Sequence, residues 1–487
     1  MLGELKQLLK HGSVYGLGNV LNKAIGFLLI PFYTRYLSTG DYGTLELLDL
    51  SAALVGLLLS VWMNASLVRY YYEYDNPRDR HSLVATALIF SAGCCAVLSV
   101  VGIFFSKQIS TLILKSPVYY HLIWIIVCNL FVTSIASVLW SYFRAQQRST
   151  LIVLLNGASL ALMLGLNIYF LAVLKTGFAG ILYGSLIANT VVTVGLAAMV
   201  VRQVGVTFDL QKVRNLAAFG LPLIFTSLSA FELNFADRFF LQHYSTVSVV
   251  GLYALGYKFG FMLSFLIIQP FIMIWGARMY EVAKREDAAK VMSRVFSYFA
   301  LLLSAVALVL SLSIKEVISV IAAPAFHDAW KVTPVVALAY VFYGIAYCCQ
   351  TGLYVAKKTS RLGLIGVICA ATNILLNILL IPHYAAQGAA WATCLSFFIM
   401  AGLTYALAHS VYTISFRVRQ ITAFILLAVA TYGASTMVRT PSLVLSVGLK
   451  LGLLTMFGAA ACIVVLLDKE EAHTFRRALR LAWQRVG

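Results

Sequence analysis

The chain has 487 residues, of which 61% are hydrophobic and only 11% are charged. An average soluble domain is about 45–50% apolar and about 25% charged, so this composition excludes an ordinary soluble protein and indicates a membrane protein. The formal net charge of +18 would suggest nucleic-acid binding in a soluble protein, so the placement of the basic residues has to decide what they do.

Apolar runs of about twenty residues, separated by polar or Pro/Gly clusters, predict transmembrane helices. We therefore expect an all-α integral membrane protein with about 14 transmembrane helices. In chain order the runs are 12–35, 43–66, 82–105, 118–143, 150–174, 177–201, 214–238, 249–275, 294–314, 333–356, 360–381, 386–409, 419–438 and 444–467.

Lysines and arginines are distributed unevenly between the loops on the two sides of this predicted bundle. Most of them lie on the side of the two termini, and the positive-inside rule predicts that this side is cytoplasmic. The asymmetry accounts for the net charge without nucleic acid. Two basic, amphipathic segments, 277–294 and 468–487, are expected to lie as helices on an anionic lipid surface.

The sequence resembles itself at an offset of about 205–210 residues. YGLGNV (15–20) corresponds to FGLPLI (219–224), and FRAQQRS (143–149) corresponds to YVAKKTS (354–360). FYTRYLSTGDYG (32–43) has a looser counterpart in FADRFFLQHYSTVSVVGLY (235–253), Asn167 corresponds to Asn377, and TGFAGILYGSLIA (176–188) corresponds to AAQGAAWATCLSF (385–397). Chance similarity between apolar helices is the alternative, but the loop motifs match in register.

Six helices per copy would place both copies in the membrane in the same orientation, as two lobes around a cavity that alternates its access. The expected domains are an N-terminal lobe at 1–201, a cytoplasmic linker at 202–213, a C-terminal lobe at 214–410, two extra helices at 411–467 and a basic amphipathic tail at 468–487.

Ionisable residues within the predicted spans are the candidates for function, because each costs roughly 2.5–3.5 kcal/mol at the bilayer centre on insertion scales. Lys23 lies in the first span beside a polar stripe that includes Asn22, and Lys258 lies deep in the eighth. We expect both lysines to be functional. Glu46 and Asp49 share one face of the second span, and they predict either a structural ion pair or a titrating site.

Other charged residues lie near the ends of the spans. Four of them can mark helix ends in the headgroup region: Arg35, Asp41, Asp237 and Arg238. Glu232 and Asn234 lie near the outer end of the seventh span. Lys450 is shallow and outside the repeat, so its ammonium group is expected to snorkel to the interface.

No metal, cofactor or enzyme site is predicted. The eight cysteines all fall in apolar runs without zinc-site spacing, so we interpret them as packing residues. GLGN (16–19) lacks the third glycine of a dinucleotide loop, and the chain contains no GxxxxGK[ST], HExxH or GxSxG motif. A non-enzymatic role is therefore expected.

The segment GSVYGLGNVLNKAIGFLLIPFYTRYLSTGDYGTLELL (12–48), together with the duplication and the RAQ/AKK loops, resembles the polysaccharide-transport family of the multidrug/oligosaccharidyl-lipid/polysaccharide (MOP) flippase superfamily. The resemblance covers about 12–410. It implies two six-helix lobes in a V-shaped arrangement like that of multidrug and toxic compound extrusion (MATE) transporters. It also implies a bacterial inner-membrane protein with both termini in the cytoplasm.

The substrate implied by this resemblance is an undecaprenyl-pyrophosphate-linked oligosaccharide, moved from the cytoplasmic to the outer leaflet for O-antigen, exopolysaccharide or capsule biosynthesis. A cavity would stabilise the pyrophosphate away from bulk water. The expected substrate-binding residues are Lys23, Lys258, Arg35, Arg238, Asn22 and Asn234. The family is associated with coupling to an H⁺ or Na⁺ gradient, for which Glu46, Asp49 and Glu232 are the candidate carboxylates. Anionic lipids, and the polysaccharide polymerase and chain-length or export machinery, are the other implied partners.

Three alternatives remain open. A lipid II flippase also has fourteen helices and a cationic cavity, whereas a cation-coupled multidrug exporter would carry an acidic site where this chain has Lys23. A membrane-embedded polymerase or ligase would need a large external loop with catalytic residues. The longest external loop, at about 315–332, is short and contains only Lys315, His327 and Asp328 as obvious candidates.

Overall fold

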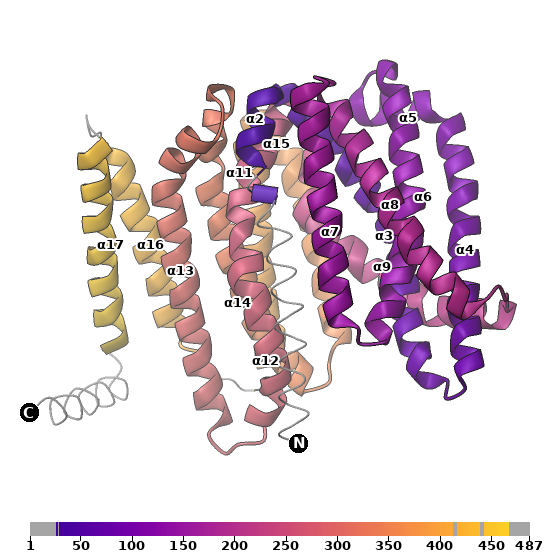
Figure 1. The fold of residues 1–487 in the computed structure, drawn as a ribbon. Coiled ribbons are helices and arrows are strands. Elements are labelled where there is room, and N and C mark those ends of the chain that lie inside the picture. The colour runs from indigo at the N-terminus through magenta and orange to yellow at the C-terminus, as the bar shows by residue number, and fades with distance from the viewer. Residues whose placement is uncertain (1–25, 28, 413–415, 439–442, 467–487) are drawn as a thin grey trace, which may run out of the picture. The chain divides into compact units, whose positions relative to one another are not determined.

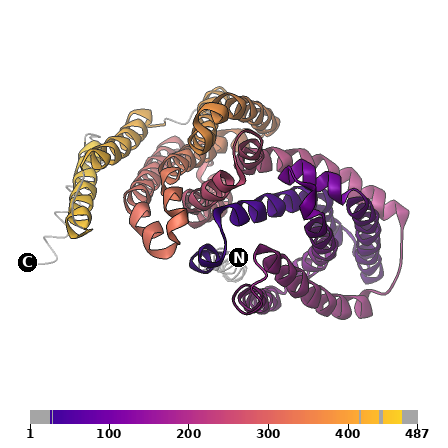
Figure 2. The ribbon, with the colours of Figure 1, turned by 90° about the horizontal axis from the view of Figure 1, so that it is seen from above.

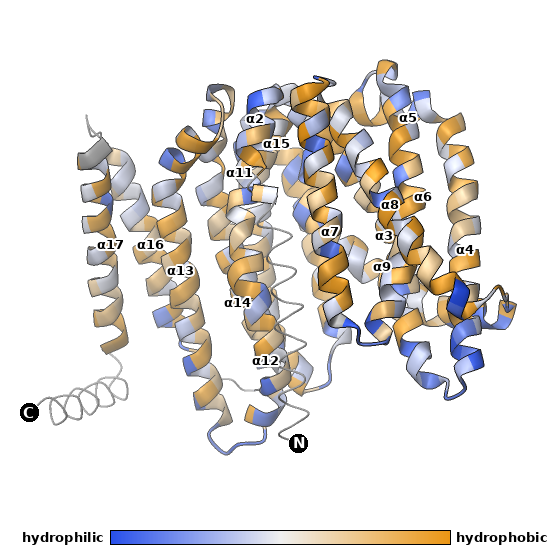
Figure 3. Cartoon of the chain, viewed as in Figure 1, coloured by the Kyte–Doolittle hydropathy of each residue, from blue (hydrophilic) through white to orange (hydrophobic). Residues whose placement is uncertain are grey.

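The computed structural model describes residues 26–27, 29–412, 416–438 and 443–466, and every regular element among them is helical (Figure 1). Twelve of these helices are long and apolar enough to cross a membrane. Hydrophobic residues cover most of their length, and hydrophilic residues gather near many of their ends (Figure 3). The expected all-α membrane fold is therefore confirmed. Asn22, Lys23 and the tail 468–487 lie outside the described residues.

The chain forms two compact units, and the first, unit 1, comprises Met1–Ala254, Ile321–Phe326 and Asn377–Ala386. Its described helices are α2 (Ile30–Tyr36), α3 (Thr39–Glu73), α4 (Pro77–Phe104), α5 (Ser106–Leu114), the 3-10 turn η1 (Pro117–Tyr119), α6 (Tyr120–Ala145), α7 (Ser149–Ile168), the π-turn η2 (Tyr169–Val173), α8 (Phe178–Val204), α9 (Leu210–Phe235), α10 (Asp237–Tyr244) and the first turns of α11 (Val247–Leu263).

The second, unit 2, comprises Leu255–Val320, His327–Leu376 and Gln387–Gly487. After the rest of α11 it contains the π-helical turn η3 (Ser264–Ile268), α12 (Gln269–Val282), α13 (Ala288–Ile321) up to Val320, the last part of the 3-10 segment η4 (Pro324–Lys331), α14 (Thr333–Val355), α15 (Ser360–His409) without its middle stretch Asn377–Ala386, α16 (Val418–Met437) and α17 (Leu443–Leu466). Within this unit α16 and α17 pack side by side (Figure 2).

Local sequence signals explain where several helices begin. At the start of α3, the Ser38 hydroxyl accepts a hydrogen bond from the Asp41 backbone N–H at 3.1 Å, and the Asp41 carboxylate accepts one from the Ser38 N–H, also at 3.1 Å. This reciprocal pair is a capping box, which satisfies backbone donors that have no partner inside the helix. The expectation that Asp41 marks a helix end is thus confirmed. Asp209 caps α9 in the same way by accepting from the Gln211 N–H at 2.8 Å.

The predicted spans agree well with the helices. The 50-residue α15 contains one non-helical residue, Ala385, with a φ of +48°, which separates the predicted spans 360–381 and 386–409. The twelve candidate spans, one of which thus holds two predicted crossings, account for all but one of the runs. The remaining run, 12–35, lies largely outside the described residues.

Two boundary predictions were wrong. The segment 277–294 is not a separate surface helix, because α12 continues to Val282 and α13 begins at Ala288. Between them Arg285 hydrogen-bonds Asp287 at 2.8 Å and lowers the pKa of that carboxyl below its usual value. At its other end α13 continues to Ile321, so the segment expected to be a loop from residue 315 onward is partly helical.

The backbone supports the internal repeat. Gln147 and Lys357 both adopt a positive φ, at +57° and +55°, and Lys175 and Ala385 do so at +53° and +48°. Each pair is separated by 210 residues. The first two turns share their hydrogen bonds as well, because the N–H groups of residues 147 and 148 bond to the carbonyls of 144 and 143, and those of 357 and 358 bond to the carbonyls of 354 and 353. The predicted pairing of 143–149 with 354–360 is therefore shifted by one residue.

The boundary between the two units falls after Ala254, whereas the predicted linker between lobes lies at 202–213. Unit 1 includes α9 because this helix packs closely along α3. The Ser66 hydroxyl donates to the Leu216 carbonyl at 2.8 Å, and a Cβ on Gly220 would lie only 2.4 Å from the Trp62 carbonyl oxygen. The two units are defined by contacts between residues, whereas the two lobes were predicted from the sequence repeat. The predicted lobe boundaries therefore stay a prediction.

Candidate functional site

The predicted site residues that the structure describes fall in both units. Arg35, Glu46, Asp49, Glu232, Asn234 and Arg238 belong to unit 1, and Lys258 belongs to unit 2. Arg35 lies in the last turn of α2 with its side chain exposed. A cation at a helix C-terminus interacts favourably with the helix dipole, which is consistent with its expected place at a helix end.

Glu46 and Asp49 lie three residues apart on the continuous helix α3 and so share a face, as predicted. Glu46 is half-buried and Asp49 is exposed, while the neighbouring Leu47, Leu48 and Leu50 are buried. The two carboxylates therefore occupy the less packed side of an otherwise buried helical turn. Whether they titrate during a reaction cycle stays a prediction.

The main cluster of polar side chains in unit 1 forms at the break between α9 and α10. Arg238 is 1% exposed and its guanidinium Nη1 lies 2.6 Å from the Asp237 carboxylate, which is 2% exposed. The Tyr253 hydroxyl donates a hydrogen bond to the other oxygen of the same carboxylate. Arg238 also donates to the Asn234 carbonyl at 2.6 Å, which satisfies a backbone acceptor at the end of α9.

This cluster changes the interpretation of two predicted residues. Asp237 does begin a helix, as expected, and its carboxylate is buried in an ion pair. Arg238 is held between the rings of Phe235 and Tyr253, with centroid distances of 5.4 and 5.2 Å. A guanidinium that is buried and paired is not accessible to a ligand in this conformation. Its contacts hold the α9–α10 break together, and a role of Arg238 in substrate binding stays a prediction.

Glu232 and Asn234 lie one turn before this cluster on α9. Both carboxylate oxygens of Glu232 are shielded from solvent and have no hydrogen-bond partner among the described residues. The Asn234 side-chain amide donates to the Ala230 carbonyl at 2.8 Å. A buried carboxylate without a donor is costly when it is charged, so Glu232 is the predicted coupling candidate with the least compensated environment.

Lys258 lies on α11 in unit 2 and is half-buried, whereas its sequence neighbours Tyr257 and Phe259 are buried. The hydroxyl of Tyr257 and that of Tyr340 on α14 form a buried hydrogen bond of 2.8 Å. The helix that carries Lys258 is thus packed tightly on one side, whereas the lysine itself retains some exposure.

Sequence reasoning missed one ion pair between helices. The ammonium nitrogen of Lys450 on α17 lies 2.5 Å from Glu316 Oε1 on α13, and the two side chains are only 21% and 28% exposed. Glu316 was assigned to a loop because α13 was expected to end at residue 314. The pair connects the last turns of α13 with α17, and whether the Lys450 ammonium lies at the membrane interface stays a prediction.

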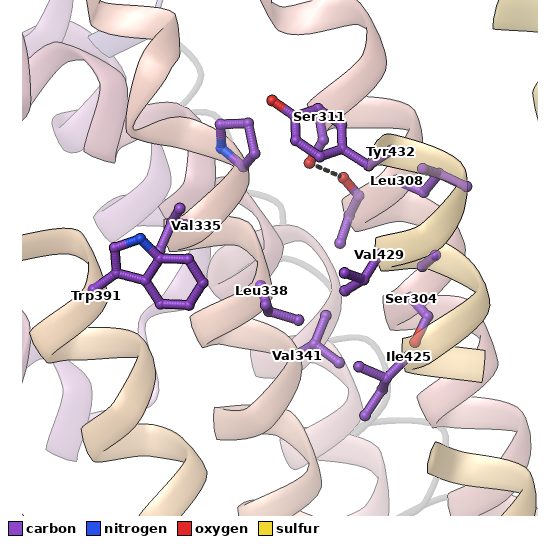
Figure 4. A pocket seen from close by; sticks show the side chains of 13 residues that line it. Ser304, Leu308, Ser311, Val335, Leu338, Val341, Trp391, Ile425, Val429 and Tyr432 are labelled. Carbon is purple, nitrogen blue, oxygen red and sulfur yellow. Dashed lines mark hydrogen bonds between the residues drawn. The ribbon is translucent and has the colours of Figure 1, made fainter. Parts of the chain in front are cut away.

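Each unit also contains an apolar cavity. In unit 1 a cavity of about 240 Å³ lies between α3, α4, α5 and α6. In unit 2 a cavity of about 170 Å³ lies between α13, α14, α15 and α16, with Trp391 on one side and Tyr432 near Ser311 at one end (Figure 4). Of the predicted cationic residues that the structure describes, none lines either cavity. Among the described residues, no group of three or more His, Cys, Asp or Glu side chains could hold a metal ion.

Comparison with known proteins agrees with this architecture. Residues 8–274 match the family described as "Polysaccharide biosynthesis protein". An uncharacterized membrane protein of Haemophilus influenzae is 23% identical over 275 residues, which cover 54% of this chain and 62% of that protein. A protein of the Lsg locus of the same organism is 22% identical over 268 residues, covering 54% of this chain and 63% of that one. The chain thus spans about three fifths of the length of these curated relatives.

Solved structures share the fold at low sequence identity. A lipid II flippase, MurJ, in an inward closed conformation has a TM-score of 0.72 at 12% identity, covering 93% of this chain and 98% of that one. An inward-facing multidrug resistance MATE transporter of the MOP superfamily has a TM-score of 0.59 at 13% identity, covering 82% and 95%. The Vibrio cholerae MATE transporter VcmN in its bent form has a TM-score of 0.54 at 15% identity, covering 86% and 98%.

Because the family match extends over more than half of the chain and the helices adopt this shared architecture, the protein is a multi-pass membrane protein that belongs to the polysaccharide biosynthesis family and has the fold of the MOP-superfamily transporters.

Proposed function

We propose that the protein is a flippase that moves an undecaprenyl-pyrophosphate-linked oligosaccharide from the cytoplasmic to the outer leaflet of the bacterial inner membrane. Two findings together carry this proposal: residues 8–274 match a polysaccharide biosynthesis family, and nearly the whole chain has a transporter fold. The internal repeat supports alternating access, since two parallel copies can rock against each other around a fixed site.

The chemistry of the substrate gives the predicted residues their roles. A pyrophosphate is an anion that pays a large desolvation cost inside a membrane, and charge-assisted hydrogen bonds from lysine or arginine offset this cost. Lys23, Lys258 and Arg35 are the proposed anion-binding residues, with Asn22 and Asn234 as polar neighbours. Arg238 contributes indirectly by fixing the α9–α10 break next to Asn234.

Coupling to an H⁺ or Na⁺ gradient is part of the proposal, with Glu46, Asp49 and Glu232 as the candidate carboxylates. Glu232 is favoured among them because both of its carboxylate oxygens are shielded from solvent and have no hydrogen-bond partner among the described residues, so an incoming cation would compensate its charge. Binding and release of a cation would therefore change the energy of this helix end.

The test uses proteoliposomes that contain a polyprenyl-pyrophosphate-linked oligosaccharide in both leaflets. A glycosidase outside the vesicles digests only the outward-facing molecules, so an active flippase exposes the remainder to digestion. We expect complete digestion with the native protein and at least a tenfold slower second phase with Lys258→Ala. Lys258→Arg, which retains the charge, should restore most of the rate, and Lys358→Ala in an exposed loop should leave it unchanged.

Lipid II is the second candidate substrate, because the MurJ structure shares the fold. The same vesicles prepared with lipid II, with an added lipid II-binding or cleaving reagent outside, test this alternative directly. Faster exposure of lipid II than of the oligosaccharide carrier would assign the protein to lipid II. If the native protein exposed neither lipid, the flippase proposal would be wrong.

A further inference from the structure

The first turns of α3 and α11 cross with their backbones in direct contact, within unit 1. A Cβ built on Gly43 would lie 2.0 Å from the Val247 carbonyl oxygen and 2.9 Å from the Gly251 nitrogen. A Cβ on Gly251 would lie 2.1 Å from the Thr39 carbonyl oxygen and 3.0 Å from the Gly43 nitrogen. Any side chain larger than hydrogen at either position would force the two helices apart.

The contact is reciprocal. Gly251 follows Gly43 by 208 residues, and Val247 follows Thr39 by the same number. Gly43 contacts the Val247 carbonyl, and Gly251 contacts the corresponding carbonyl of Thr39. Gly40 lies similarly opposite Ser248, its own counterpart, with 3.4 Å between a Cβ on Gly40 and the Ser248 Oγ. Contacts in which i meets j and j meets i define a two-fold axis. A local two-fold axis therefore relates the first turns of α3 and α11 and passes between Gly43 and Gly251.

Further contacts surround this crossing. The ring of Tyr42 packs edge-on against Phe326, with ring centroids 5.6 Å apart. The Ala323 N–H donates a hydrogen bond of 3.2 Å to the Thr34 hydroxyl. Residues 34–43, 247–251 and 321–326 of unit 1 thus meet at one end of the helices, and the distribution of basic residues predicts that this end faces outward.

We propose that this glycine crossing, formed by Gly40, Gly43, Ser248 and Gly251, is the seal that closes the outer end of the transport path and must part for substrate release. The proposal rests on the proposed function. Small residues allow two helices to approach until their backbones touch, which leaves no passage for a sugar between them. The four residues that form the crossing carry no charged side chain, so these residues can separate without exposing a buried charge of their own.

The first experiment locks the seal with a disulfide. In a background from which the eight native cysteines have been removed, Gly40→Cys/Ser248→Cys places a sulfur near the position of the Ser248 oxygen, at a distance suited to a disulfide. We expect oxidation to cross-link the protein, shown by a mass loss of two hydrogens, and to slow transport at least tenfold until a reductant is added. The two single-cysteine variants are the controls, and oxidation should not change their transport.

The second experiment opens the seal and does not depend on transport. Thr44, just beyond the crossing on α3, is 7% exposed, so Thr44→Cys should resist a membrane-impermeant maleimide added from outside. Adding Gly43→Ala should make this cysteine reactive, because the new methyl group displaces α11. Gly93→Ala is the matched control, since a Cβ on Gly93 meets nothing within 4 Å.

The outcomes separate this inference from the proposed function. A complete cross-link with undiminished transport would overturn the seal and leave the flippase function standing. Failure to cross-link, together with equal labelling in the Gly43→Ala and Gly93→Ala backgrounds, would overturn the crossing itself. A native protein that transports nothing would overturn the proposed function alone, because cross-linking and labelling still report on the seal.

Discussion

The two copies of the FYTRYLSTGDYG motif differ in their charges and agree in their glycine contact. In the first copy Arg35 is exposed at the end of α2, and only Leu37 and Ser38 separate α2 from α3. In the second copy the short helix α10 takes the place of α2, two residues again separate it from α11, and Arg238 at its start is buried against Asp237. Gly43 and Gly251 nevertheless meet the same backbone atoms of their partners. Backbone packing has therefore been retained in both copies, whereas the arginine lies at opposite ends of the two short helices and is exposed in one copy and buried in the other.

The test with the largest expected effect removes the buried partner of Arg238 and, for comparison, the exposed charge of Arg35. Asp237→Ala leaves the Arg238 guanidinium buried and uncompensated, and we expect a loss of about 3–5 kcal/mol of stability. Arg35→Ala removes an exposed charge and should cost less than about 0.5 kcal/mol. Thermal unfolding of the purified variants in detergent, followed by tryptophan fluorescence, measures both.

A double variant guards this comparison against a general loss of folding. Asp237→Leu/Arg238→Met replaces both charges with apolar side chains, and it should recover most of the stability that Asp237→Ala loses. Equal stability of the Asp237→Ala and Arg35→Ala variants would contradict the buried ion pair.

A smaller effect tests the regions where the copies agree. Gln147 and Lys357 both occupy the left-handed region of backbone conformation in corresponding turns, where a β-branched residue is strongly disfavoured. Gln147→Val and Lys357→Val should each lower stability by about 1–2 kcal/mol, and by similar amounts. Gln147→Gly and Lys357→Gly are the controls and should show no such loss in the same unfolding measurement. A loss confined to one copy would show that the turns are not equivalent.

The smallest effect concerns the starts of α3 and α11. Ser38 forms a complete capping box with contacts of 3.1 Å, whereas the corresponding Thr246 hydroxyl accepts from the Val249 N–H at the longer distance of 3.4 Å. Ser38→Ala should therefore cost about 1 kcal/mol and Thr246→Ala clearly less. Chemical denaturation of the two variants side by side measures the difference, and a reversed order would refute the capping argument.

Much of the fold was predictable because the membrane imposes a strong length and hydrophobicity constraint on each helix. The spans, the break near Ala385 and the cap at Asp41 follow from local sequence. The end of α13 could not be predicted from local sequence, because Glu316 looks like a loop residue until its partner Lys450 is known. That partner lies 134 residues away in the sequence, and no local pattern connects the two.

The candidate site was less predictable for the same reason. The positions of Glu46, Asp49 and Lys258 on their helices follow from periodicity, but the burial of Arg238 depends on Tyr253, which reaches Asp237 from the next long helix. Adjacent Asp and Arg residues at a predicted helix end can equally be solvated. Only the tertiary arrangement distinguishes a buried pair from an exposed one.

The reciprocal glycine contact has a consequence for the ancestry of the chain. Because each side presents the same atoms to the other, a single half-length polypeptide carries everything needed to form this seam with a second copy of itself. Fusion of two such genes would preserve the seam without any new residue, while freeing each half to change its charges independently. The exposed arginine in one half and the buried one in the other are the kind of divergence that such a fusion permits.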